Sequence, residues 1–194
     1  MKGKEIAFLG IILLVVLTWS LHQPHDYFTW VLEVLPILVI GPVLIWTYPR
    51  FQFSRVTYFL LFLHTIILLA GAHYTYAKVP LFEWFKEWFG WERNYYDRLG
   101  HFFQGFVPAV VLREILVRQS VVNGRSWLNV IVLGLCLAFS ASYELFEWGV
   151  AIFTGTAADD FLGTQGDVWD TQWDMAMAFM GAGLSLWIFR EKNY

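Results

Sequence analysis

Charged residues are scarce in this 194-residue chain, and cysteine is nearly absent. Charged side chains make up 15% of the sequence and hydrophobic ones 58%, with a mean hydropathy of +0.52. A soluble domain carries about 25% charged residues, so an ordinary water-exposed surface is excluded. The chain also lacks the basic stripe that nucleic acid requires, which excludes nucleic acid as a partner. The lone Cys136 excludes a disulfide framework and a cysteine-ligated metal site.

Long apolar runs are what the sequence has instead. Six of them approach the ~20 residues that cross a hydrocarbon core as a helix. They cover residues 6–22, 27–47, 55–75, 96–117, 127–153 and 169–189. We therefore expect an all-α fold, a polytopic membrane helix bundle of about six transmembrane helices in the lipid bilayer, forming a single transmembrane domain over residues 1–194. The alternative for the first run is a signal anchor of the same orientation.

A short aromatic segment, residues 81–91, separates the third run from the fourth. On a helical wheel its aromatic side chains share one half, and Glu83, Lys86 and Glu87 share the other. This pattern is typical of a helix that lies in the membrane interface. It predicts a short interfacial helix that anchors the chain, and the alternative is an element that gates a substrate. The segment from Thr154 to Gly166 lacks a period and predicts a loop.

The distribution of basic residues predicts the orientation of the bundle. Six spans place both ends on one side, and that side collects nine of the 13 basic residues. They are Lys2, Lys4, Arg50, Arg55, Arg113, Arg118, Arg125, Arg190 and Lys192. Because positive residues mark the cytoplasmic side, we expect both termini in the cytoplasm and the chain in the bacterial inner membrane.

Three clusters of acidic residues or histidine are the candidate functional residues, because ionisable groups in apolar helices are costly and usually functional. Each follows helical spacing, so its members share one face. The clusters are Asp97 with His101 and Gln104, Glu144 with Glu147 and Ser140, and Asp167 with Asp170 and Asp174. The predicted orientation places all three at the same outer depth of the membrane, where they can converge.

Carboxylates with one imidazole predict a site for a divalent cation. We expect Asp97, His101, Glu144, Glu147, Asp170 and Asp174 as metal ligands. This donor set suits Mg²⁺, Mn²⁺, Ca²⁺ or iron better than a structural zinc site, although Zn²⁺ stays among the candidates. Glu33 and His73 are candidate extra ligands, and the deeper His64 is a weaker one.

Each cluster also has a purely structural interpretation. Asp97 can form an interfacial ion pair with the adjacent Arg98, and the two glutamates can pair with Arg93 or Arg98 in a buried network. Asp167 follows Gly166 and is typical of a helix N-cap. At the other end of the fourth run, Glu114 and Arg118 have the spacing of an ordinary surface pair.

Three sequence blocks carry a resemblance to a known family. They are YDRLGHFFQG at 96–105, SYELFEW at 142–148 and GDVWDTQWDMAMAFMGA at 166–182. Together they resemble the YjdF-like bacterial inner-membrane proteins, and the resemblance extends over nearly the whole chain. It implies a multi-span inner-membrane architecture and supplies no substrate. The Asp run at 167, 170 and 174 is faintly similar to part of the metal motif of CDP-alcohol phosphatidyltransferases, whose preceding Asp-Gly and Ala-Arg pairs this chain lacks.

Three classes of function follow from these residues. The leading hypothesis is a metal-dependent hydrolase or transferase that acts on a lipid-linked phosphate or another small anionic substrate, with Asp97 and His101 as acid, base or ligand and Arg98 as the phosphate partner. The second is a proton- or cation-coupled transporter or channel that uses the same acids. The third is a structural or assembly partner. The sequence leaves the oligomeric state open.

Overall fold

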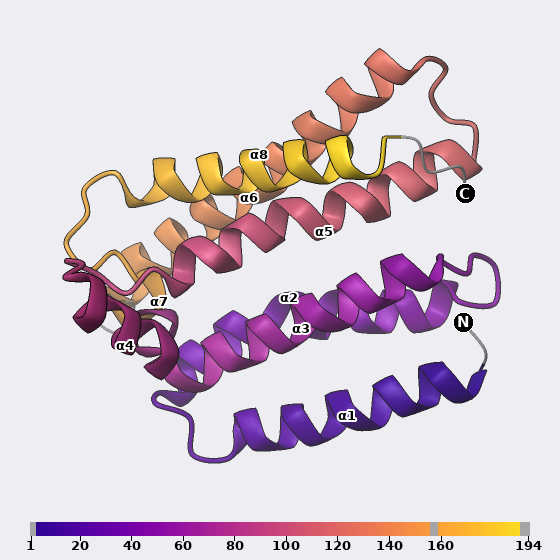
Figure 1. Ribbon diagram of the computed structural model, residues 1–194. Helices are drawn as coiled ribbons and strands as arrows, with labels where there is room; N and C mark the ends of the chain where they lie inside the picture. The colour runs from indigo at the N-terminus through magenta and orange to yellow at the C-terminus, as the bar shows by residue number, and fades with distance from the viewer. Residues whose placement is uncertain (1–2, 156–158, 191–194) are drawn as a thin grey trace.

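The computed structural model describes residues 3–155 and 159–190, and within them every regular element is a helix. The elements are α1 Gly3–Leu21, α2 Tyr27–Thr47, α3 Arg55–Tyr74, the short 3₁₀ helix η1 Tyr76–Lys78, α4 Pro80–Phe89, α5 Tyr96–Arg118, α6 Arg125–Thr154, α7 Asp159–Leu162 and α8 Asp170–Ile188. The start of α1 and the end of α8 lie at the same end of the bundle (Figure 1). Lys2 and Lys192, two of the basic residues counted for orientation, lie outside the described residues.

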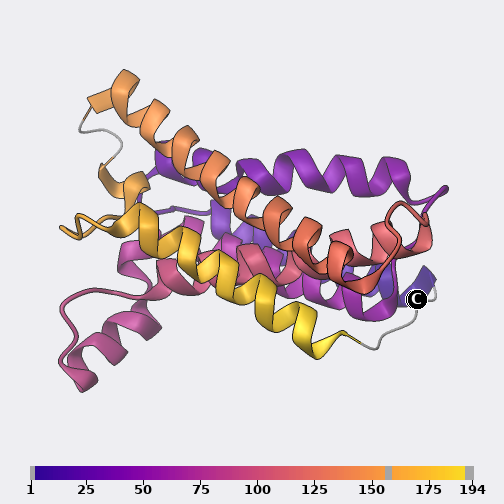
Figure 2. The same ribbon diagram turned by 90° about the horizontal axis from the view of Figure 1, so that it is seen from above.

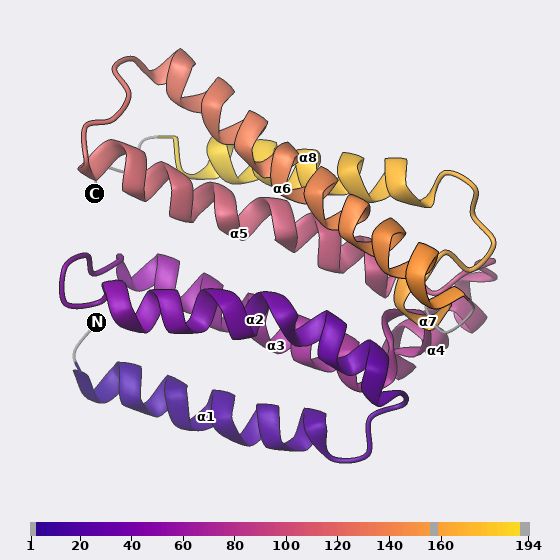
Figure 3. The ribbon, with the colours of Figure 1, turned by 180° about the vertical axis from the view of Figure 1, so that it is seen from behind.

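The long helices form two groups that lie side by side. Figures 1 and 3, which view the molecule from opposite sides, show α1, α2 and α3 in one group and α5, α6 and α8 in the other. The principal contact between the groups is that of α3 with α5, and α8 packs chiefly against α5. Half of the residues in the spanning window of α5 are buried, more than in the other four candidate spans. Helix α5 is therefore the centre of the fold.

The predicted bundle is confirmed, with a qualification for the last span. Among the described residues, five helices are long and apolar enough to cross a membrane: α1, α2, α3, α5 and α6. The sixth, α8, is 19 residues long, as is α1. However, its first residues include Asp170, Thr171, Gln172 and Asp174, which lower its hydropathy below that of a typical span. The two acids face protein instead of lipid, because Asp170 and Asp174 are buried, whereas Thr171 and Gln172 are exposed. Buried polar positions are compatible with a transmembrane helix in a bundle.

Local sequence signals fix where the helices begin and end. Asp26 accepts a hydrogen bond from the Thr29 backbone N–H at 2.6 Å and caps α2, and Ser54 caps α3 in the same way. Pro80 occupies the first turn of α4, where its missing N–H costs nothing. Gly90 ends α4 in the left-handed conformation, with φ of 66°.

The expected interfacial helix is present as α4. None of its residues is buried, and Trp84, Trp88 and Phe89 are exposed. Figure 2 shows α4 projecting to one side of the long helices. The predicted loop from Thr154 to Gly166 contains one short helix, α7, which forms because Phe161 packs against the rings of Tyr143 and Phe146 on α6. Residues 156–158 of that loop lie outside the described part of the chain.

Two glycines allow α5 and α8 to pack backbone against backbone. A Cβ atom at Gly105 would overlap the carbonyl oxygen of Ala178, and one at Gly181 would overlap that of Phe102. Small residues at such crossings let transmembrane helices approach closely. The close approach holds the α5 and α8 acidic residues beside one another.

Glu114 and Arg118 do pair, at 2.9 Å, but the expectation of a surface pair was wrong. Glu114 is fully buried, because its carboxylate also accepts hydrogen bonds from the Ser54 backbone N–H at 2.6 Å and the Thr57 hydroxyl at 2.5 Å. It therefore ties the start of α3 to α5, a contact that helical spacing alone does not reveal.

Candidate functional site

The three predicted clusters meet at the end of the bundle that carries α4. His101 on α5 is their centre. Its Nε2 atom lies 3.6 Å from Asp97 Oδ1, 3.7 Å from Glu144 Oε1 on α6 and 3.7 Å from Asp174 Oδ1 on α8. All four side chains are buried. Residues separated by up to 77 positions thus surround one nitrogen atom.

A hydrogen bond orients the His101 ring. Its Nδ1 atom lies 2.7 Å from Oε1 of Gln104, one turn further along α5. An amide oxygen only accepts hydrogen bonds, so Nδ1 carries a proton. In the neutral ring, the lone pair of Nε2 therefore points toward the three carboxylates. Lone pairs repel carboxylate oxygens, so this arrangement needs either a second ring proton or a cation among the four groups.

The glutamates on α6 extend the cluster. His101, Glu144 and Glu147 each offer a ligand atom within 4.8 Å of the other two, as do Asp97, His101 and Asp174. Oε1 of Glu144 is buried and has no hydrogen-bond partner among residues 3–155 and 159–190. One turn deeper, the Ser140 hydroxyl is also buried and without a partner in the same part of the chain. Buried oxygens normally have partners, so both atoms are candidates to bind water or an ion.

Two arginines, Arg93 and Arg98, contact the aspartates of the cluster. Asp170 Oδ1 accepts hydrogen bonds from Arg93 Nη1 at 2.6 Å and Arg98 Nη2 at 2.5 Å, and Arg98 Nη1 bonds to Asp174. Asp97 Oδ2 lies 3.5 Å from Arg98 and 3.7 Å from Arg93. The arginines thus pair with the aspartates, and within the described contacts neither pairs with Glu144 or Glu147.

Asp167 lies in the loop before α8. Its Oδ1 accepts a hydrogen bond from the Trp169 backbone N–H at 2.9 Å, and its Oδ2 lies 3.2 Å from Arg98 and 3.3 Å from Arg93. The backbone N–H, with the two guanidinium groups, holds the pKa of Asp167 below its ordinary value. Asp167 therefore does not cap α8 directly; it forms a turn three residues before the helix begins.

The remaining candidates lie at different distances from the centre. Glu33 on α2 is buried and interacts electrostatically with Asp97. It does not belong to either of the two sets of residues around His101 whose ligand atoms lie within 4.8 Å of one another. His73 on α3 faces α1 within its own helix group, where its Nδ1 lies 3.1 Å from the Ser20 carbonyl oxygen and its ring contacts Trp19. His64 Nε2 is buried on α3 and has no hydrogen-bond partner among the described residues.

The loop 163–166 covers the cluster, and sequence reasoning missed it. Arg93 Nη2 donates to the Gly163 carbonyl oxygen at 3.2 Å. The Gln165 amide bonds to the Asn94 backbone at both ends, each at 2.9 Å. These bonds join positions about 70 residues apart through backbone atoms, so side-chain periodicity carries no signal for them. The i, i+4 spacing of Arg93 and Asp97 is the one local clue.

The comparisons with known proteins agree with this architecture. Residues 6–192 match the family described as "Predicted membrane protein (DUF2238)". The chain is 50% identical to "Inner membrane protein YjdF" of Escherichia coli (strain K12) over 173 residues, which cover 89% of this chain and 83% of the relative. No solved structure matches. The protein is thus an integral, multi-pass membrane protein, and the likeness supports the expected place in the bacterial inner membrane. The chain belongs to the DUF2238 family of membrane proteins.

Proposed function

We propose that this protein binds a divalent cation among Asp97, His101, Glu144, Glu147 and Asp174, close to the outer face of the membrane. One observation carries the proposal. His101 Nε2 lies 3.6–3.7 Å from three carboxylate oxygens, while Gln104 keeps the ring proton on Nδ1. Two ligands that share a cation at about 2.1–2.4 Å lie about 3.0–3.9 Å from each other. The observed separations fall within that range.

The local charge also supports a cation. Six carboxylates gather here, those of Asp97, Glu144, Glu147, Asp167, Asp170 and Asp174. Arg93 and Arg98 compensate two of them and leave a formal excess of four negative charges when all the acids are ionised. Carboxylates in a low-dielectric interior need compensating charge. Asp170, whose described contacts are with the arginines, serves in this proposal to hold the network beside the cation.

The outer placement is part of the proposal. Arg50, Arg55, Arg118 and Arg125 lie at the end of the bundle opposite to α4. Because positive residues mark the cytoplasmic side, both termini lie in the cytoplasm and the cluster faces the outer leaflet. The aromatic face of α4 suits headgroup depth on that side.

Metal analysis of the purified protein tests the proposal. We expect about one divalent ion per chain by mass spectrometry after purification in detergent, and micromolar or tighter rebinding of Mn²⁺ after chelation. Glu144→Gln removes a ligand charge and should weaken binding by about tenfold or more. Glu92→Gln is the matched control, because Glu92 is exposed in the loop before α5. A protein that neither retains nor rebinds any divalent ion would overturn the proposal.

The arginines favour a phosphate ester as the substrate. Arg98 bonds to Asp174, whose Oδ1 lies 3.7 Å from His101 Nε2, so a phosphoryl oxygen that replaced one of the aspartate partners of Arg98 would lie next to the proposed cation. A bound cation would polarise the phosphoester, and Asp97 would hold or move a proton, because the cation and Gln104 would occupy both nitrogens of His101. Such a site fits a hydrolase or transferase for lipid-linked phosphates. Release of inorganic phosphate from a polyprenyl or phosphatidyl phosphate, lost in His101→Gln, would support this activity.

Transport of protons or cations is the second candidate, because the same acids suit a pathway. A pathway must continue to the opposite end of the bundle. There an apolar cluster fills the space between α5, α6 and α8, formed by Ala109, Leu128, Val132, Cys136, Ala182 and Leu186. This packing supports a one-sided site. Ion flux in proteoliposomes that disappears in Glu147→Gln would rank transport above the hydrolase or transferase. If chelators change neither the stability nor the activity of the protein, it is a structural partner instead.

A further inference from the structure

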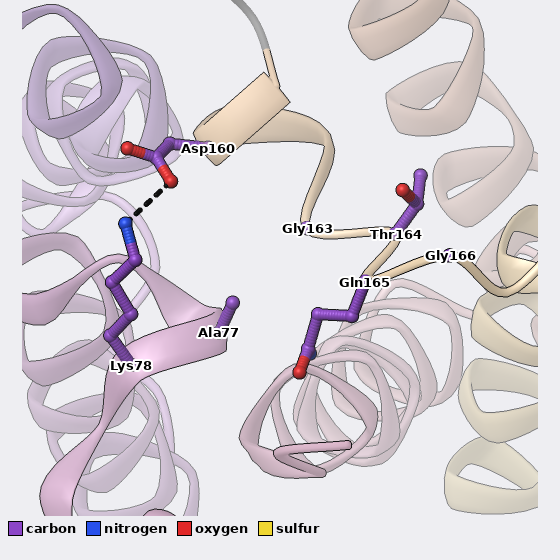
Figure 4. A pocket seen from close by; sticks show the side chains of 7 residues that line it. All are labelled: Ala77, Lys78, Asp160, Gly163, Thr164, Gln165 and Gly166. Carbon is purple, nitrogen blue, oxygen red and sulfur yellow. Dashed lines mark hydrogen bonds and ion pairs between the residues drawn. The ribbon is translucent and has the colours of Figure 1, made fainter. Parts of the chain in front are cut away.

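An open cavity lies beside the carboxylate cluster. It measures about 570 Å³ and is lined by η1 on one side and the α7–α8 loop on the other. Figure 4 shows Lys78 and Asp160 joined on one wall, with Thr164 and Gln165 across the opening. We propose that this cavity is the entry site through which a hydrated divalent cation reaches the cluster, an inference that rests on the proposed metal binding.

Gly163 connects the cavity with the cluster. It lines the cavity, and a Cβ atom placed on it would lie 4.0 Å from Oδ2 of Asp97. Asp97 itself is absent from the lining, so the backbone at Gly163 separates the two spaces. Gly163 has φ of 60°, which favours glycine, and adds no side chain of its own to this partition, which the Arg93 guanidinium borders through its bond to the Gly163 carbonyl oxygen. A cation in the cavity is therefore one backbone thickness from a proposed ligand.

The size of the cavity suits a hydrated ion. Six waters and the ion they surround need about 200 Å³, taking about 30 Å³ for each water. The cavity exceeds that volume more than twofold. Its lining offers the Thr164 hydroxyl and loop backbone, which can bond to the waters of an ion such as Mg²⁺ that gives up its hydration shell slowly.

The charges around the cavity favour a cation over an anion. Lys78 and Asp160 are the charged residues of the lining, and they pair with each other at 2.7 Å. Lys78 Nζ also lies 2.7 Å from His25 Nε2, which further occupies its donors. The lining is thus close to neutral, whereas the cluster behind Gly163 has its excess of carboxylates. The resulting field draws positive ions from the cavity toward Asp97.

A blocked entry should slow metal loading without weakening metal binding. Thr164→Cys in a Cys136→Ala background supplies one thiol in the cavity, because Cys136 is the protein's only cysteine. The full-length protein in detergent is labelled with a charged, bulky thiol reagent, and loading with Mn²⁺ is followed by the loss of the free-ion paramagnetic resonance signal. We expect labelling to slow loading at least tenfold and to leave the final occupancy unchanged. Labelled Glu92→Cys, in the same background, is the control.

The outcomes separate this inference from the proposed function. If unlabelled protein binds Mn²⁺ and labelled Thr164→Cys loads at the same rate, the entry site is overturned and the ion enters elsewhere, such as past Glu147 from the lipid-facing side of α6. If labelled and unlabelled protein both fail to bind Mn²⁺, the proposed metal site fails and the entry site fails with it. Because each protein is compared with its own unlabelled form, misfolding of a variant appears as lost occupancy before labelling.

Discussion

At the scale of single residues, the hydrogen bond between Gln104 and His101 decides the chemistry of the cluster. The 2.7 Å contact fixes which ring nitrogen faces the carboxylates. Metal-binding histidines usually donate their other N–H to a carboxylate, carbonyl or water, and this partner raises the affinity of the site. Gln104 is therefore a positioning residue, which acts on a cation through His101 without contacting it.

Replacing Gln104 should change metal affinity more than stability. Gln104→Leu preserves the size of the side chain but removes the acceptor, so we expect Mn²⁺ affinity to fall about 10–100-fold. Gln104→Glu keeps an acceptor for Nδ1 and should restore most of the affinity. Calorimetric titration measures both variants. Equal loss of affinity in the two would contradict a positioning role, because a merely structural residue would not distinguish a retained acceptor from a lost one.

At the scale of helices, the crossing of α5 and α8 matters most, because these helices supply Asp97, His101 and Asp174. Their backbones touch at Gly105 and Gly181. Helix α8 is less apolar than α1, α2, α3 and α6, so its place in the bundle depends strongly on this contact and on the bonds of Arg98 to Asp170 and Asp174. The geometry of the cluster is thus set by helix packing several residues away from it.

A methyl group at the crossing should separate the two helices. Gly105→Ala and Gly181→Ala each place a Cβ atom against a carbonyl oxygen, and overpacking of this kind costs about 1–3 kcal/mol. Gly183→Ala is the matched control on α8, because nothing lies within 4 Å of its Cβ position. The control should be neutral or stabilising by up to about 1 kcal/mol, since alanine favours helix.

Thermal unfolding in detergent measures all three glycine variants, and Mn²⁺ titration reports whether the cluster survives. A Gly105→Ala protein as stable as Gly183→Ala would mean that α5 and α8 do not pack as closely as described.

The sequence predicted the helices and the convergence of the clusters better than it predicted their partners. Apolar runs define spans directly, and the helical spacing of Asp97 and His101 places them on one face. Which acid meets which arginine depends on the loop that precedes α8, so the pairing of Asp170 with Arg93 and Arg98 had no local signal. Glu114 was misjudged for the same reason, because its burial depends on where the chain turns at Ser54.

At the scale of the whole molecule, the two helix groups contribute unequally. The ligand atoms proposed for the cation come from α5, α6 and α8. Helices α1, α2 and α3 contribute the nearby Glu33 and meet the other group mainly through α3. The first group therefore supports the site and borders it, whereas the second group builds it.

The orientation of the bundle can be tested with fusions to alkaline phosphatase, which is active only outside the cytoplasm. We expect high activity for a fusion after Glu92, in the loop before α5, and at least tenfold lower activity after Gly124, in the loop before α6. Immunoblots normalise the activity to expression. The reverse pattern would place the cluster at the cytoplasmic face and contradict an outward-facing site.

The position of α8 at the end of the helix order has a consequence for biogenesis. Chains emerge from the ribosome N-terminus first, so α5 and α6 reach the membrane before α8 exists. Until then Arg98 lacks Asp170 and Asp174, its partners on α8. Until α8 is inserted, the charged side chains of α5 and α6 stay at the translocon or near the lipid headgroups. Insertion of α8 then completes both the ion pairs and the proposed ligand set. Chains truncated before α8 would expose unpaired charge to lipid and become substrates for membrane quality-control proteases.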